Sequence, residues 1–356
     1  LDTVPSICPE RARIFTEAMK ESEGQPIVLR RAAAFAQVLA RMSIYVREGE
    51  LIVGNQARKP RAAPVFPEYS VGWIVKEFEG DPYHTWERPN DVYEYDEDTR
   101  KQILSTIEYW RGKTLYETVR SLIPEEARQA WDLAAIDDDW VTQNGFGNVL
   151  PNYESVLEEG LGGLIARARE RIEDLDLTQP GAARQKWFLE AAIVGNQAVI
   201  DFAHRFADEL QSLSTKESDP SRKDELLLMA RNCRTVPENP PQSFWEALQA
   251  IWFIHCCIQI ETNGIAISFG RFDQFLWPYY RDDIESGNLT RERALELVEN
   301  LFIKVNEMNI FRSWEGAKFF PGYHMAINLA IGGQNPDGTD ASNDLTYVVL
   351  DATESM

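Results

Sequence analysis

A helix with no polar face constrains this sequence more than any other feature. The proline-rich segment 237–241 precedes Ser243, where a helix is predicted to begin, and that helix continues into a mainly apolar run over residues 251–260. Neighbouring residues on a helix point to different faces, so a run that is apolar on every face has to be buried. We therefore expect this segment to lie inside a hydrophobic core. Gly264 then changes the local geometry, and a buried strand or loop should follow.

The chain is long enough to supply such a core, because it has 356 residues of which 44% are hydrophobic. Its formal net charge of -21 would repel a phosphate backbone and disfavours DNA and RNA as partners. No apolar run reaches the roughly 18 residues that a bilayer span requires, and the first residues lack the parts of a signal peptide. We expect a cytoplasmic protein without a membrane segment, and its four cysteines should be reduced.

Apolar spacing predicts helices along most of the first 240 residues. They are expected over residues 10–20, 30–42, 182–217 and 222–232, with a further helical segment that ends at Trp110. These segments should form a mainly helical layer.

Two places in the sequence are typical of strands. Residues 44–46 and 51–53 alternate apolar side chains on either side of the turn at 48–50, which predicts a small β-hairpin. Residues 325–331 are a short apolar strand candidate that is followed by a glycine pair. Helix alternating with buried strand indicates the α/β class.

Metal and nucleotide sites have no support in the sequence. The histidines are scattered and none has the spacing of a common zinc motif; they are His84, His204, His255 and His324. No glycine-rich phosphate-binding string opens a helix after a strand. We therefore predict neither a metal site nor a nucleotide site.

Two further clusters each allow a functional and a structural interpretation. His255 beside Cys256 could activate a thiolate nucleophile, but buried cysteine also behaves as a small hydrophobic residue, and we favour core packing. Residues 143–153 place amide side chains between glycines that would let a ligand approach the backbone. A surface turn has the same composition, and composition alone favours the turn.

Short strings recur along nearly the whole chain in a fixed order. They are CPERA (8–12), GQP (24–26), RRA (30–32), ELIVGN (50–55), FPE (66–68), YWRGKT (109–114), PNYE (151–154), ETNG (261–264), SFGRFDQ (268–274), PYY (278–280), FPGY (320–323), GG (332–333) and DASN (340–343). In this order and at these separations they resemble glycyl radical enzymes of the pyruvate formate-lyase-like family, in particular relatives of glycerol dehydratase and choline trimethylamine-lyase. The strings between residues 261 and 280 look like this family's barrel signature, and residues 319–343 continue the pattern.

The resemblance implies a ten-stranded α/β barrel wrapped by helices, of which this chain would be the N-terminal part. Residues 1–240 would be the mainly helical outer layer with a small hairpin, and residues 241–356 would start the barrel. Inside such a barrel two loops meet, one with a thiyl cysteine in a Gly-Cys-Val-Glu string and one with a radical glycine in an Arg-Val-x-Gly-Tyr-like string. Neither string occurs here.

A chain that lacks both loops has no catalytic residue of its own. We therefore expect an incomplete polypeptide, inactive without a C-terminal half that lies beyond Met356. The family implies no directly bound cofactor, a glycyl radical installed by a radical S-adenosylmethionine activating enzyme, and a homodimer.

The resemblance also points to five substrate-binding positions. In the diol dehydratases a histidine stands at the place of Asn148, and a His-Ser pair stands at the places of Ile265 and Ala266. These replacements remove groups that hold substrate hydroxyls, which disfavours glycerol. Asn144 aligns with a position that contacts the charged end of choline or isethionate, and Tyr323 aligns with an aromatic wall or with plain barrel packing.

These observations favour a glycyl radical lyase that acts on a small organic substrate, as a dehydratase or in another cleavage of a C–O, C–N, C–S or C–C bond. An arylacetate decarboxylase or a fumarate-adding synthase of the same family is also compatible with apolar residues at 265 and 266. A non-catalytic or regulatory half-barrel is the alternative from another class.

Overall fold

The computed structural model describes residues 3–79, 90–133, 135, 139–145, 147–323 and 325–356. Within them the chain is mainly helical, and its helices are α1 (Glu10–Glu21), α2 (Ile27–Arg41), α3 (Gly72–Glu79), α4 (Glu97–Trp110), α5 (Leu115–Leu122), α6 (Glu125–Asp132), α7 (Asp139–Asn144), α8 (Tyr153–Glu173), α9 (Ala182–Ser214), α10 (Pro220–Thr235), α11 (Phe244–Glu261), α12 (Phe272–Phe275), α13 (Trp277–Ser286), α14 (Arg291–Glu307), α15 (Trp314–Phe319) and α16 (Asp344–Ser355). The predicted helices are therefore confirmed, with ends that differ by a few residues.

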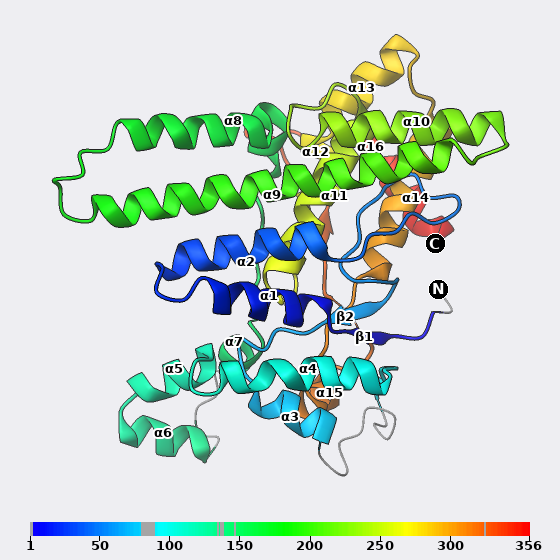
Figure 1. Ribbon diagram of the computed structural model, residues 1–356. Helices are drawn as coiled ribbons and strands as arrows, with labels where there is room; N and C mark the ends of the chain where they lie inside the picture. The colour runs from blue at the N-terminus through cyan, green and yellow to red at the C-terminus, as the bar shows by residue number, and fades with distance from the viewer. Residues whose placement is uncertain (1–2, 80–89, 134, 136–138, 146, 324) are drawn as a thin grey trace.

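The long helices form one layer on the outside of the molecule. α9 packs against α8, α10 and α2, and α1 joins α2 to α4 (Figure 1). Phe202, Phe206 and Leu210 of α9 are fully buried at helical spacing, so this layer is held by one apolar stripe.

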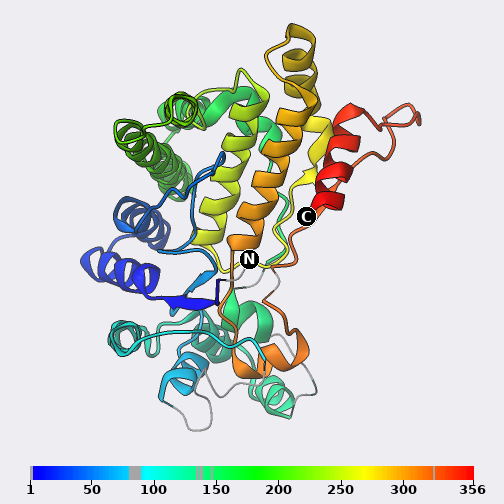
Figure 2. The same ribbon diagram turned by 90° about the vertical axis from the view of Figure 1, so that its right-hand side faces the viewer.

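α11 is the buried helix that the sequence predicts. Its N-cap is Ser243, whose side chain accepts a hydrogen bond from the backbone N–H of Glu246 at 3.2 Å. Almost all of its side chains are buried, including Trp252 and Phe253. α11 lies beside α14 in the middle of the molecule, between the outer layer and α16 (Figure 2).

The predicted β-hairpin is wrong. Residues 44–46 and 51–53 form no strand, and Leu51, Ile52 and Val53 are all buried instead of alternating between core and solvent. The side chain of Gln249 accepts a hydrogen bond from the N–H of Val53 at 2.9 Å and donates one to its carbonyl at 2.7 Å. A side chain on α11 therefore takes the place that a partner strand would have.

The strands of the described residues are short and pair in parallel. β1 (Ser6–Cys8) pairs with β2 (Ala62–Pro64), and β3 (Gly270–Arg271) pairs with β4 (Leu329–Ala330). The strand expected over 325–331 is confirmed only at β4. The α/β class predicts more sheet than the described residues contain. These residues do not show a ten-stranded barrel.

Left-handed backbone explains why the strands near β3 and β4 are so short. Ala266, four residues before β3, and Ala326, three residues before β4, have φ values of 57° and 51°. A residue in this region cannot continue an extended strand, and a side chain there is strained. Single hydrogen bonds therefore replace a continuous ladder, such as the bond from the Ala266 N–H to the Met325 carbonyl at 2.7 Å.

Two absences hold for the described part of the chain. None of its helices has the length and apolar character needed to span a membrane. Its acidic, histidine and cysteine side chains form no group of three or more that could hold a metal ion. His84 and His324 lie outside the described residues.

Candidate active site

Three segments of the chain meet around the ETNG and SFGRFDQ strings, residues 261–264 and 268–274. We call residues 147–150, 262–271 and 325–331 the three site segments. The N–H of Ser268 donates to the carbonyl of Val149 at 3.1 Å, and the N–H of Phe269 donates to the carbonyl of Asn328 at 2.9 Å. The middle segment is therefore bonded to the other two, although they are distant in sequence.

The residues just before the first segment are also joined to the start of the second, at the ends of α7 and α11. The side chain of Asn263 donates to the carbonyl of Asn144 at 2.9 Å, and the hydroxyl of Thr262 donates to the carbonyl of Gly145 at 3.4 Å. Gly145 has a φ of 70°, and an added Cβ would lie 2.3 Å from the ring of Tyr69. Only glycine fits at this junction.

A buried arginine fixes the end of α11, from which the middle segment begins. The guanidinium of Arg11 donates to the carbonyl of Ile260 at 2.7 Å and to that of Glu261 at 3.1 Å. It also forms two hydrogen bonds, of 3.1 Å and 2.6 Å, with the carboxylate of Glu68. A cation at a helix C-terminus satisfies carbonyls that have no partner in the helix, so Arg11 sets where the segment leaves α11.

A buried carboxylate fixes the other end of the middle segment. Asp273 is fully buried, accepts a hydrogen bond from the N–H of Gly332 at 2.7 Å, and is bonded by the hydroxyl of Thr346. Arg271 donates to the carbonyl of Gly332 at 2.9 Å. The SFGRFDQ string thus ties the second site segment to the residues that follow the third.

The site segments line an open cavity of about 410 Å³, which is within the size range of small-molecule sites. Asn148 and Ala266 line it, together with Ser268, Leu150 and Asn328. Most of its wall is apolar, and the amides of Asn148 and Asn328 supply hydrogen-bonding groups. Such a cavity can orient a small organic molecule that carries a few polar atoms.

The remaining sequence-predicted residues lie near this cavity but do not line it. Ile265 is half-buried against the core. The side-chain oxygen of Asn144 is buried and accepts no hydrogen bond from any described residue. Tyr323 lines a neighbouring hollow with Arg61, and its hydroxyl donates to the carbonyl of Val92 at 2.6 Å. The structure therefore brings Asn148 and Ala266 together and leaves Tyr323 in a separate hollow.

His255 and Cys256 have the character of core residues. Burial lowers the pKa of His255 to about 3 and raises the pKa of Cys256 to about 12, so both are neutral near pH 7. His255 stacks on Phe269 with ring centres 4.4 Å apart, and its Nδ1 lies 3.0 Å from the hydroxyl of Tyr153. The geometry therefore favours packing over an activated thiol.

Arg11, Glu68 and Asp273 were not predicted as parts of the site, although each lies in a string that carried the resemblance. No local pattern shows that Arg11 and Ile260, 249 residues apart, are in contact. The only available signal was the charged residue itself, inside strings that are otherwise rich in apolar residues.

Known proteins resemble this chain over nearly its whole length. The chain is 37% identical over 352 residues to the probable dehydratase YbiW of Escherichia coli, with 98% of this chain and 43% of the relative covered. It is 36% identical to the isethionate sulfite-lyase of Oleidesulfovibrio alaskensis, with 97% and 43% covered.

A solved structure has the same fold over nearly the whole chain. The glycerol-bound form of the B12-independent glycerol dehydratase from Clostridium butyricum matches with a TM-score of 0.94 and 37% identity, over 98% of this chain and 44% of that one. The chain thus spans less than half the length of these relatives. The family model for pyruvate formate lyase-like proteins matches residues 1–356. The chain therefore belongs to the pyruvate formate lyase-like family of glycyl radical enzymes, as its ordered strings predict.

Proposed function

We propose that this chain forms part of the substrate pocket of a glycyl radical lyase that breaks a C–O, C–N, C–S or C–C bond in a small organic molecule. The observation that carries this proposal is the cavity lined by Asn148 and Ala266, built from the strings typical of the family. A radical installed by a radical S-adenosylmethionine activating enzyme would supply hydrogen abstraction. The residues of this chain would bind and orient the substrate and exclude water.

The radical-bearing residues are proposed to lie outside residues 1–356, so that this chain has no catalytic residue and is inactive alone. The absence of both radical-loop strings supports this, as does the coverage of only 43% of the relatives. The four cysteines are free, which suits a reducing compartment such as the cytoplasm. We further propose that the enzyme is a homodimer, which rests on the family alone.

Two of the site segments, residues 262–271 and 325–331, are proposed to be strands of a ten-stranded barrel. Residues 1–240 would then be its mainly helical outer layer, and residues 241–356 would start its wall. The parallel pairing of β3 with β4 and the hydrogen bond from Ser268 to Val149 support this arrangement.

The pocket residues favour a substrate less polar than glycerol. Ala266 presents a methyl group to the cavity, Ile265 beside it is apolar, and Asn148 offers one amide. We propose that Asn144, whose side-chain oxygen accepts no hydrogen bond from the described residues, and Tyr323 complete the substrate surroundings in the whole enzyme. Burying a polar group without a hydrogen-bond partner costs about 1–3 kcal/mol of free energy. Substrate hydroxyls that face apolar side chains therefore weaken substrate binding.

A lyase is favoured over an arylacetate decarboxylase, a fumarate-adding synthase or a regulatory half-barrel. The relatives at 37% and 36% identity are named as a probable dehydratase and a sulfite-lyase. Neither of these two names is that of a decarboxylase or a synthase.

The first experiment is the intact mass of the natural polypeptide, isolated without oxygen. A mass near twice 40.7 kDa supports a single chain that carries the radical loops, while 40.7 kDa implies either a split enzyme with a separate partner chain or a non-catalytic relative. Electron paramagnetic resonance after treatment with the activating enzyme then tests for the radical. An organic radical signal is expected, and its absence from the complete protein contradicts the proposal.

The second experiment changes the pocket. The triple variant Asn148→His, Ile265→His and Ala266→Ser should raise turnover of glycerol, by about 10-fold or more if one hydrogen bond is regained. The control is Ile27→His, because Ile27 is 59% exposed on α2. Equal glycerol turnover in the triple variant and the control would show that these positions do not select the substrate.

A further inference from the structure

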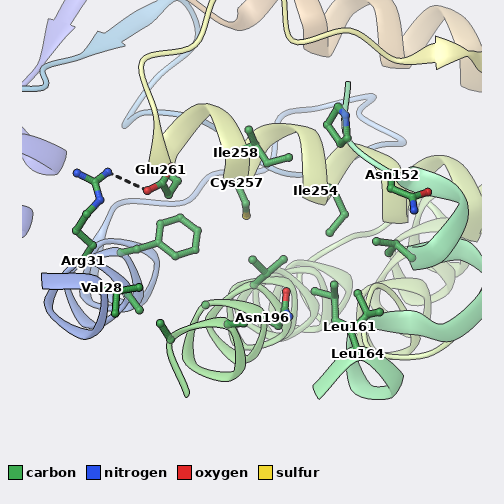
Figure 3. Close-up of a pocket in the computed structure, with 18 residues that line it drawn as sticks. Val28, Arg31, Asn152, Leu161, Leu164, Asn196, Ile254, Cys257, Ile258 and Glu261 are labelled. Atoms are coloured by element: carbon green, nitrogen blue, oxygen red, sulfur yellow. Dashed lines mark hydrogen bonds and ion pairs between the residues drawn. The ribbon is translucent and has the colours of Figure 1, made fainter. Parts of the chain in front are cut away.

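A second cavity lies between α2, α8, α9 and α11 and shares no lining residue with the candidate active site. Its volume is about 490 Å³. Ile254 and Cys257 reach into it from α11, Leu161 and Leu164 from α8, and Val28 from α2 (Figure 3). The wall is therefore mainly apolar and comes from four separate helices.

Small residues on α9 create the space. Ala191, Ala192 and Gly195 line the cavity where larger apolar residues would fill it. A Cβ added at Gly195 would meet no atom within 4 Å. Glycine in the middle of a helix is unfavourable by about 1 kcal/mol relative to alanine, so the sequence keeps this opening at a cost.

Polar groups are few and placed at definite points. The amide of Asn196 points from α9 into the cavity (Figure 3). Its side chain makes no hydrogen bond within the described part of the chain. At one end Arg31 and Glu261 form an ion pair at 2.9 Å. Because these two charges cancel, the lining offers no net charge to an ion.

We propose that this cavity binds a small uncharged molecule with an apolar body, aromatic or branched, and one hydrogen-bonding group that pairs with Asn196. Its volume is within the range of about 300–1,000 Å³ for small-molecule sites. An uncharged ligand loses little hydration on entering an apolar cavity, whereas a charged one would have to compete for a partner with the ion pair of Arg31 and Glu261. This inference is independent of the proposed lyase reaction.

The test uses N-phenyl-1-naphthylamine, a neutral aromatic amine with one N–H donor whose fluorescence rises in apolar surroundings. It is titrated into the natural-length protein under anoxia. Saturable binding of one molecule per chain is expected. No saturable binding overturns the proposal, and it is the result expected if another segment of a longer polypeptide fills the cavity.

Two variants on α9 locate the bound probe. Gly195→Leu fills the cavity and should weaken binding at least 10-fold, while Val194→Leu should leave it unchanged because Val194 is exposed beside the cavity. Both changes introduce leucine, which is a good helix former, and thermal unfolding checks that each variant is folded. Equal binding by the two variants places the probe elsewhere and overturns the proposal.

A third variant tests the polar contact. Asn196→Leu keeps an apolar wall but removes the amide, and it should weaken probe binding by about 2- to 10-fold. If Gly195→Leu fails to fold, Ala192→Leu replaces it as the filling variant. Unchanged or tighter binding to Asn196→Leu removes the proposed role of the amide and rejects the ligand class.

Discussion

The outer layer of α2, α8, α9 and α10 and the three site segments are built in opposite ways. In the layer, residues at helical spacing such as Phe202 and Phe206 are buried together, and each helix supplies its own backbone hydrogen bonds. In the site segments, backbone groups bond across the chain, and Ala266 and Ala326 adopt left-handed conformations. Local pattern therefore determines the layer, whereas long-range polar contacts determine the site.

The largest effect is expected from removing Arg11, the arginine that binds the end of α11. Arg11→Met leaves the carboxylate of Glu68 buried without its partner, and we expect the free energy of unfolding to fall by about 3–5 kcal/mol. Denaturant unfolding measures this change. The matched control is Arg13→Met on the same helix, whose ion pair with Glu17 is exposed and contributes less than about 1 kcal/mol.

A double variant separates charge from packing. Arg11→Met with Glu68→Leu removes both buried charges and should regain much of the lost stability. If the single and double variants are equally unstable, then the contacts of Arg11 with the carbonyls of Ile260 and Glu261 dominate. If Arg11→Met and Arg13→Met unfold alike, long-range polar contacts do not hold the site.

The buried histidine gives a pH-dependent effect of intermediate size. The pKa of His255 in the folded state is about 3, below its unfolded value of about 6.5. Between these values the unfolded chain binds a proton that the folded chain does not, so stability falls as pH falls, by up to about 1.4 kcal/mol per pH unit. Above pH 6.5 the histidine contributes no slope.

The variant His255→Gln isolates this contribution. Between pH 6 and 4 the free energy of unfolding of this variant should fall less steeply with pH than that of the parent protein. The difference in slope should correspond to about one proton taken up on unfolding. Urea unfolding at several pH values provides the comparison. Equal slopes for the two proteins would mean that His255 is protonated in the folded state.

The smallest expected effect is that of replacing an alanine by glycine, and its sign should differ between the site segments and the outer layer. Ala266→Gly relieves a left-handed alanine and should stabilise the protein by about 0.5–1 kcal/mol. Ala33→Gly, in the middle of α2, should destabilise it by about 1 kcal/mol. Thermal unfolding of both variants tests the contrast, which is lost if the two changes have the same sign.

The helices could be predicted because their signals are local. Ser243 as an N-cap and the apolar run after it were enough to predict α11 and its burial. The hairpin at 44–53 was wrong because alternating residues favour a strand only if a partner strand takes the backbone hydrogen bonds. Here Gln249 takes them, and nothing near residue 53 in the sequence indicates it.

The site was predicted in part, through resemblance more than through residue chemistry. Asn148 and Ala266 were expected to share a pocket, and they line one cavity. The left-handed conformation of Ala266 could not be predicted, because alanine carries no preference for it. The roles of the five pocket residues in substrate binding stay predictions until the variants are tested.

The long separation between Arg11 and the helix end that it holds also shapes how the chain is made. Arg11 meets Glu68 after 57 more residues, but Ile260 follows it by 249. At about 5–20 residues per second, a ribosome needs on the order of 10–50 seconds to cover that distance. Until Ile260 has been made, the guanidinium of Arg11 can pair with Glu68 but not with the carbonyls at the end of α11. The contacts that fix the start of the second site segment can therefore form only late in synthesis.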